Sequence, residues 1–200
     1  MHSTALVYLR LGLHHIADLR GYDHILFIAA LTIPYRSADW RRLLWLVTAF
    51  TAGHSTTLAL ATFDLVRLNA RLVETAIAAT ILAASLFTLG SVLRSPDPEP
   101  RPETGERARY AMAVGFGLIH GLGFSTFLRS LLGDEDSLVL PLFSFNVGLE
   151  FGQLTIVVGV LALGWIVDRV LRQSRRSWVL ISSGTVAGLG AGMLVQRLRG

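Results

Sequence analysis

Six long apolar stretches run through the sequence, and they limit what the chain can fold into more than any other feature. Each has about twenty mostly hydrophobic residues, the length that an α-helix needs to cross the hydrocarbon core of a bilayer. They cover residues 11–33, 43–63, 72–93, 110–132, 138–167 and 178–195. Only 16% of the residues are charged, against about 25% in an average soluble domain. The sequence therefore predicts an all-α integral membrane protein, a bundle of about six transmembrane helices.

The first apolar stretch is interrupted by polar residues. Asp18 and Arg20 stand inside it, and Gly21 is a residue at which a helix can kink. If this stretch is split, the bundle has seven helices instead of six. We expect residues 1–200 to form a single transmembrane domain, with a proline-rich cytoplasmic loop at about residues 94–109.

The arginines predict how the chain is oriented. All 18 basic residues are arginine, and they cluster between the apolar stretches. The connections after the first, third and fifth stretches hold 11 of them, and the opposite side holds 7. Because cytoplasmic connections carry the excess of positive charge, both termini are expected outside the cytoplasm. This distribution indicates a multi-pass protein among membrane lipids, and we expect no binding of nucleic acid.

Four of the stretches carry an ionisable residue near their middle. These residues are His24 beside Asp23, His54, His120 and Glu150. An ionisable side chain near the bilayer centre costs several kcal/mol and is by default a sign of function. Because all of them fall at about the same depth, we predict that they share one site.

Polar neighbours extend this predicted site. Asn146, Glu150 and Gln153 follow one another at helical spacing and form a single polar stripe. Ser55 directly follows His54. Hydroxyl and amide groups of this kind orient metal ligands from an outer shell, and Ser55, Asn146 and Gln153 are predicted to do so. His15, which precedes Asp23 by two helical turns, is a further candidate ligand.

Glycines at helical spacing predict close helix packing. Gly148 and Gly152 lie on a different face from the polar stripe, where they let a partner helix approach. Four glycines around His120, within residues 115–123, permit close packing or local unwinding. Gly184, Gly188 and Gly192 are expected to form a packing seam. Glycine-rich faces of this kind also leave room for a homo-oligomer.

The residue types indicate the class of metal. The chain has no cysteine, so imidazoles and carboxylates are the candidate ligands. That set suits Zn²⁺, Ni²⁺ or Co²⁺, whereas Mg²⁺ or Ca²⁺ would not need histidines.

Two functions fit these ligands. One is transport of a divalent transition metal ion through a mid-membrane site formed by His24, His54, His120, Asp23 and Glu150. The other is an intramembrane zinc-dependent hydrolase, in which three ligands hold Zn²⁺, a water occupies the fourth position, and Glu150 or Asp23 is the general base.

Four ordered motifs resemble a known family. They are GYDHILF from Gly21, HSTTL from His54, FGLIHGLGF from Phe116 and FNVGLEFGQ from Phe145. These motifs are similar to those of the HupE/UreJ family of bacterial membrane proteins. The resemblance implies a nickel or cobalt permease in the inner membrane, with His24, His54, His120, Asp23 and Glu150 handling the metal. The leading histidine of the family pattern stands about six residues before the aspartate, whereas His15 stands eight before Asp23.

Overall fold

The described part of the protein is entirely helical. The computed structural model describes residues 4–94, 105–124, 128 and 138–199, and these contain seven α-helices and no strand. The helices are α1 (Thr4–Ala17), α2 (Asp23–Thr32), α3 (Trp40–Thr62), α4 (Ala70–Arg94), α5 (Gly105–Gly123), α7 (Val139–Arg169) and α8 (Arg175–Arg199). Two short 3-10 turns, Leu19–Gly21 and Ser37–Asp39, precede α2 and α3. The prediction of an all-α membrane protein is confirmed.

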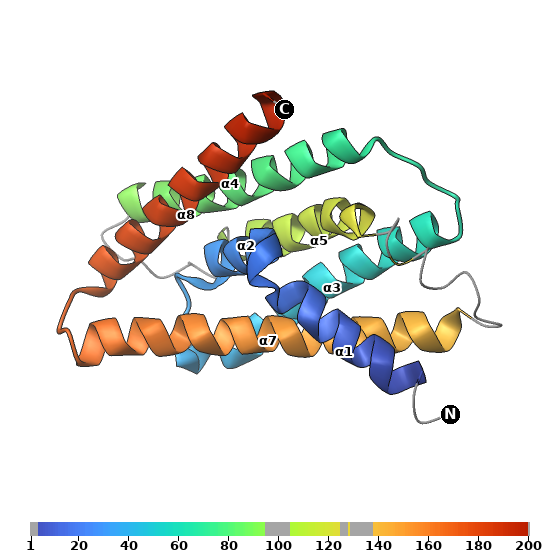
Figure 1. The fold of residues 1–200 in the computed structure, drawn as a ribbon. Coiled ribbons are helices and arrows are strands. Elements are labelled where there is room, and N and C mark those ends of the chain that lie inside the picture. The colour runs from blue at the N-terminus through green and yellow to red at the C-terminus, as the bar shows by residue number, and fades with distance from the viewer. Residues whose placement is uncertain (1–3, 95–104, 125–127, 129–137, 200) are drawn as a thin grey trace.

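Three helix pairs surround one short central helix. The most extensive contacts join α3 to α5, α1 to α7 and α4 to α8 (Figure 1). Helix α2 contacts α1, α4, α7 and α8. Its side chains Phe27, Ile28 and Leu31 are all at most 3% exposed. A helix that is apolar on all sides belongs in a core, and α2 therefore lies where the pairs meet.

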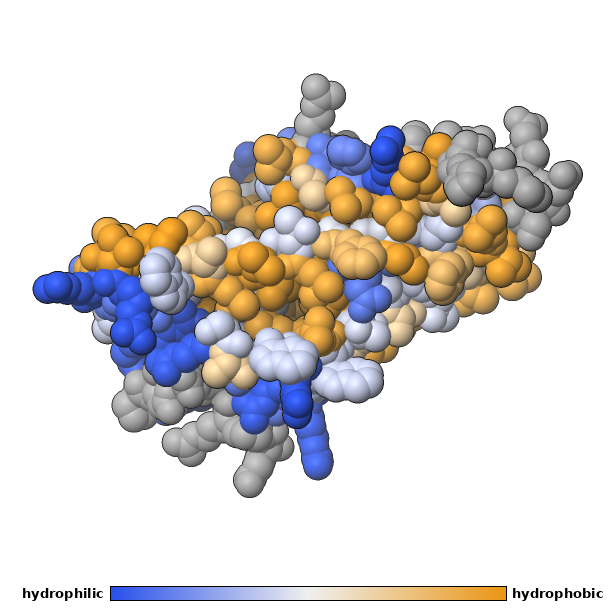
Figure 2. Space-filling model, turned by 90° about the horizontal axis from the view of Figure 1, so that it is seen from below, coloured by the Kyte–Doolittle hydropathy of each residue, from blue (hydrophilic) through white to orange (hydrophobic). Residues whose placement is uncertain are grey.

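Four of the described helices are long and apolar enough to cross a membrane. They are α4, α7, α8 and α3 together with its preceding turn. Large apolar side chains remain exposed along α7, among them Phe143, Phe151 and Trp165. Figure 2 shows an apolar band across one face of the molecule, with hydrophilic residues gathered toward its edges. Lipid in place of water explains such a surface.

The first apolar stretch is two helices. Helix α1 ends at Ala17, a 3-10 turn follows, and α2 begins at Asp23. A continuous helix would hold Asp18 and Arg20 among apolar residues, whereas in the broken chain Asp18 is exposed. Asp23 then stands in the first turn of α2, where the helix dipole favours a negative charge. The first apolar stretch is therefore split into α1 and α2, which is the second of the two predicted arrangements.

Glycines set the distance between two of the helix pairs. A Cβ added at Gly117 of α5 would lie 2.4 Å from the Phe50 carbonyl oxygen of α3, and one at Gly148 of α7 would lie 1.9 Å from the Leu9 carbonyl oxygen of α1. Helix α5 is continuous to Gly123, so the unwinding considered for residues 115–123 does not occur. Its glycines permit close packing instead.

The predicted seam on the last helix is wrong for the described chain. A Cβ at Gly184, Gly188 or Gly192 would meet nothing within 4 Å, whereas Gly190 packs against Ile81 and Leu82 of α4. These three glycines face outward, and a homo-oligomer through them stays a prediction.

Most of the predicted proline-rich loop lies outside the described residues. Its last part, from Gly105, is the first turn of α5.

Candidate metal centre

Three histidines from three different helices meet inside the bundle. His15 comes from the end of α1, His24 from the start of α2 and His54 from the middle of α3. One ring nitrogen of each lies within 4.8 Å of the others. The ring centroids of His15 and His24 are 4.7 Å apart, and those of His24 and His54 are 6.0 Å apart. His24 and His54 are buried and His15 is half-buried, so His15 is the most accessible ring of the His15–His24–His54 cluster.

The break before α2 and the glycines of α5 position these rings. Because the chain turns at Leu19–Gly21, His15 and His24 approach each other from opposite ends of that turn. On the other side, a Cβ at Gly121 would lie 2.1 Å from the His54 carbonyl oxygen. Glycine at this position lets α5 pack directly against the turn of α3 that carries His54.

Asp23 orients His24. The Nδ1 atom of His24 lies 3.0 Å from Oδ1 of Asp23, and because an ionised carboxylate only accepts, the imidazole donates from Nδ1. The same carboxylate oxygen accepts the His24 backbone N–H at 2.8 Å. Nε2 of His24 then carries a lone pair, which is the state that a metal ligand needs. A carboxylate behind a ligating histidine is a common arrangement in metal sites.

Several nitrogens of the cluster have no hydrogen-bond partner among the described residues. They are Nε2 of His15, Nε2 of His24 and both ring nitrogens of His54. Buried polar atoms are nearly always satisfied, and an unsatisfied group costs about 1–3 kcal/mol. A cation bound here would take one lone pair from each ring, so one nitrogen of each histidine fits a divalent metal of the kind that imidazole binds.

His120 stands beside the cluster and bonds elsewhere. Its ring centroid is 5.0 Å from that of His24. Its Nε2 lies 3.0 Å from the Thr80 hydroxyl, which itself donates to the Ile77 carbonyl oxygen at 2.6 Å. Thr80 therefore accepts from Nε2, and the lone pair of His120 is on Nδ1, which is buried without a partner among the described residues.

Glu150 lies in a separate polar layer between α3 and α7. It accepts a hydrogen bond from Thr48 at 2.7 Å, and Thr48 precedes His54 by six residues, or about 9 Å along the helix. The predicted outer-shell residues bond across the same α3–α7 interface. Ser55 donates to Asn146 at 2.6 Å and Thr51 donates to Gln153 at 3.2 Å. The structure thus brings His15, His24 and His54 together, with Asp23 and His120 next to them. Glu150 and the outer-shell residues instead take part in hydrogen bonds between α3 and α7 that do not include a histidine.

The cluster is open on one side and closed on the other. A pocket of about 660 Å³ reaches it, lined by His15, Asp18 and Phe124 among others. On the opposite side, toward the arginine-rich ends of the helices, Phe27 and Phe50 are at most 2% exposed, with ring centroids 5.1 Å apart. A small ion can therefore approach the cluster from the His15 side, and buried aromatic rings block the other.

A comparison with protein-family models identifies the chain. The model described as HupE / UreJ protein matches residues 1–197. The chain belongs to the HupE/UreJ family. Membership implies the handling of a divalent metal ion in general. No significant match is found among curated proteins or among solved structures.

Some residues of this HupE/UreJ protein became apparent only in three dimensions. Thr80 and Thr48 bond to His120 and Glu150, yet single threonines within apolar helices carry no signal in a sequence. Arg109, which we placed in the predicted loop, is 1% exposed inside α5, and it donates to the Thr88 hydroxyl at 3.0 Å. Its guanidinium lies over the rings of Phe87 and Tyr35, contacts that a sequence does not reveal.

Proposed function

We propose that this HupE/UreJ protein transports a divalent transition metal ion, nickel or cobalt, across the bacterial inner membrane. The observation that carries the proposal is the His15–His24–His54 cluster, with its nitrogens close together and without hydrogen-bond partners among the described residues. Neutral imidazoles are good ligands for both ions. The metal is the substrate of the protein here, and the cluster is its binding site halfway across.

The ligand set is suited to release as well as to binding. A transport site must hold an ion strongly enough to strip its water and weakly enough to let it leave. Three neutral nitrogens with one carboxylate behind them, Asp23 on His24, are less charged than a site in which Asp23 and Glu150 both ligate directly. Glu150 is then the next oxygen ligand that an ion meets, about 9 Å further along α3.

The one-sided access supports alternation between two states. The ion enters from the pocket beside His15 and is stopped by Phe27 and Phe50. A movement of α2 about the Leu19–Gly21 turn would shift both Phe27 and His24, since both belong to that helix. Broken helices at the binding site serve this purpose in many secondary transporters.

Metal uptake into proteoliposomes tests the proposal. We expect the wild type to accumulate Ni²⁺ or Co²⁺, and His54→Gln to lose that uptake because one ligand is removed from a fully buried position. The matched control is Thr56→Gln, which places the same residue two positions further along α3, at an exposed site that lines neither the cluster nor the entry pocket. Circular dichroism and gel filtration show whether His54→Gln is folded.

Two results would contradict the proposed transport through the His15–His24–His54 cluster. One is wild-type protein that binds metal but accumulates none. The other is uptake that survives His54→Gln. Stoichiometric zinc retained through purification, with hydrolysis of a lipid or peptide and no flux, would favour the intramembrane hydrolase instead.

A further inference from the structure

A small cavity lies next to the two aromatic rings that close the histidine cluster. It is lined by residues of α2, α3 and α7, and its volume of about 10 Å³ is about the least that holds one water molecule. Phe27 and Phe50 both line it. The same two rings contact His120 and His54, at centroid distances of 4.9 and 5.9 Å. The rings therefore separate the cavity from the histidines.

The cavity lies on the arginine-rich side of these rings. On α2 its lining reaches Thr32, which follows His24 by eight residues, or about 12 Å, whereas Phe27 follows His24 by only three. On α3 the lining reaches Leu46, eight residues before His54. None of the side chains that line the cavity is more than 4% exposed. An ion that passes the rings from the histidines therefore enters this enclosed space next.

Gln153 brings an amide group to this otherwise apolar cavity. Its side chain is fully buried, and its Oε1 accepts a hydrogen bond from the Thr51 hydroxyl at 3.2 Å. Its Nε2 is buried and has no partner among the described residues. Because Thr51 does not line the cavity, Nε2 is the end of the amide on the cavity side. Buried polar atoms are nearly always satisfied, so this unpaired amide indicates a ligand in the cavity.

The Gln153 amide can also present its oxygen to the cavity. Turning the group over exchanges Oε1 and Nε2, and the Thr51 hydroxyl then accepts from Nε2, since a hydroxyl accepts as well as donates. Thr32 supplies a second oxygen. Its hydroxyl donates to the Ile28 carbonyl oxygen at 2.7 Å and keeps its own lone pairs. Oxygens of this kind can replace part of the hydration shell of a cation.

The charges on either side of α2 favour a cation in this cavity. Glu150 is bonded to Thr48, which lies at the level of the cavity on α3. Across α2, the buried Arg109 of α5 donates to the Thr88 hydroxyl of α4 at 3.0 Å, and Thr88 donates to the Ala30 carbonyl oxygen of α2 at 3.2 Å. No carboxylate pairs with Arg109 in the part of the chain that the structure describes. Because a buried arginine repels cations, the side of α2 that faces α3 and α7 is the favoured route.

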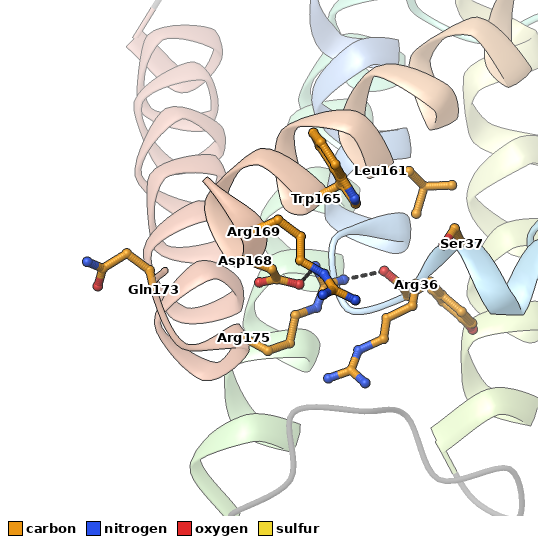
Figure 3. Close-up of a pocket in the computed structure, with 9 residues that line it drawn as sticks. Arg36, Ser37, Leu161, Trp165, Asp168, Arg169, Gln173 and Arg175 are labelled. Atoms are coloured by element: carbon orange, nitrogen blue, oxygen red, sulfur yellow. Dashed lines mark hydrogen bonds and ion pairs between the residues drawn. The ribbon is translucent and has the colours of Figure 1, made fainter. Parts of the chain in front are cut away.

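The cavity ends where α2 is joined to α7 and α8. Arg175, at the start of α8, donates to the carbonyl oxygen of Ile33 at 3.0 Å, and Ile33 directly follows Thr32. Arg175 also pairs with Asp168 of α7 at 3.6 Å, and Figure 3 shows these two side chains together at the end of α7. An ion in the cavity is therefore enclosed on the arginine-rich side as well.

We propose that this cavity is a second, transient site for the transported ion, with Oε1 of Gln153 and the Thr32 hydroxyl as ligands and Glu150 at the same level. A divalent transition metal ion would pass Phe27 and Phe50 and exchange imidazole nitrogens for these oxygens. It would then be released more easily, because such ions prefer imidazole to neutral oxygen. The proposal rests on the transport function proposed above and adds the route by which the ion leaves the histidines.

Binding and uptake of Ni²⁺, measured on the same variants of the full chain, test the proposal. Gln153→Leu removes the amide at nearly constant size. We expect it to bind Ni²⁺ with wild-type affinity in calorimetry, since the histidines are untouched, and to lose most of the uptake into proteoliposomes. Wild-type affinity would also show that the variant is folded, because the His15–His24–His54 cluster needs three helices in place. Thr32→Val removes the other oxygen and should lower uptake in the same way.

The matched control is Thr51→Val, which breaks the same hydrogen bond between α3 and α7 but leaves both oxygens of the cavity in place. It should keep binding and uptake. Wild-type uptake by Gln153→Leu, or an equal loss of uptake in Thr51→Val, would overturn the proposal. So would loss of Ni²⁺ binding in a folded Gln153→Leu, because Gln153 would then serve the histidines. Wild-type protein that binds Ni²⁺ and accumulates none would contradict transport itself, and this route with it.

Discussion

A single hydrogen bond decides which nitrogen of His24 is available to a metal. Because Asp23 accepts from Nδ1 at 3.0 Å, Nε2 is left as the ligand atom. The negative charge behind the ring makes this nitrogen a stronger metal ligand. Asp23→Asn keeps the size of this partner and removes its charge. We expect the affinity for Ni²⁺ or Co²⁺ to fall by about 10–100-fold, the usual cost of losing such a partner. Isothermal titration calorimetry of the purified protein measures it.

Glu74→Gln is the control for the loss of a carboxylate. Glu74 pairs with Arg197 at 2.8 Å near the start of α4 and is 45% exposed. Its neutralisation should leave metal affinity unchanged. Equal affinities of Asp23→Asn and the wild type would show that Asp23 does not act through His24.

His15 illustrates what residue spacing alone leaves undetermined. In one continuous helix, residues nine apart point about 180° away from each other and lie about 13 Å apart. On that basis His15 and His24 would not meet. The Leu19–Gly21 turn changes the direction of the chain and brings the two side chains to the same side, so the two rings lie 4.7 Å apart. The sequence contains the residues that break the helix, but the new direction of the chain follows from packing against α7 and α4.

At the scale of helices, regularly spaced glycines predict that another helix packs closely, but they do not show which helix it is. Gly148 and Gly152 were expected to admit a helix, and the structure shows that this helix is α1. Gly184, Gly188 and Gly192 have the same spacing and meet nothing, whereas Gly190, which is out of that series, packs on α4. Regular glycine spacing shows only that one face of a helix lacks side chains. Whether a helix covers it depends on the whole bundle.

The α1–α7 contact positions His15, and one pair of substitutions tests this. Gly148→Ala would place its Cβ 1.9 Å from the Leu9 carbonyl oxygen, while Gly159→Ala on the same helix meets nothing within 4 Å. We expect Gly148→Ala to lower the free energy of unfolding by about 1–3 kcal/mol, as overpacking does. Gly159→Ala should raise it by about 0.5–1 kcal/mol, since alanine favours a helix.

Chemical denaturation in detergent, followed by circular dichroism, measures both changes. Calorimetry should then show weaker metal binding for Gly148→Ala alone, because α1 carries His15. If the two variants were equally stable and bound metal equally well, close packing of α1 on α7 would not be what holds His15 in place.

At the scale of the whole molecule, the sequence predicts the features that depend on the surrounding lipid and on the depth of a residue in the membrane. Apolar stretches predict the long helices because lipid requires them, and the cost of buried charge indicates that His24 and His54 face each other. Glu150 was predicted at the same depth, but it bonds to Thr48, about 9 Å along α3 from His54. Depth is a property of one helix, whereas facing depends on how each helix is rotated against its neighbours.

The arginine distribution makes a prediction about the whole chain that labelling can test. The chain has no cysteine, so a single introduced thiol reports on one position. Leu68 lies in the exposed link between α3 and α4, and Ser174 in the exposed turn before α8. With both termini outside the cytoplasm, Leu68→Cys should react with a membrane-impermeant maleimide on cells whose outer membrane alone is permeabilised. Ser174→Cys should react only once the inner membrane is also opened. The reverse pattern would place the arginine-rich end outside, and the pocket beside His15 would then face the cytoplasm and serve export.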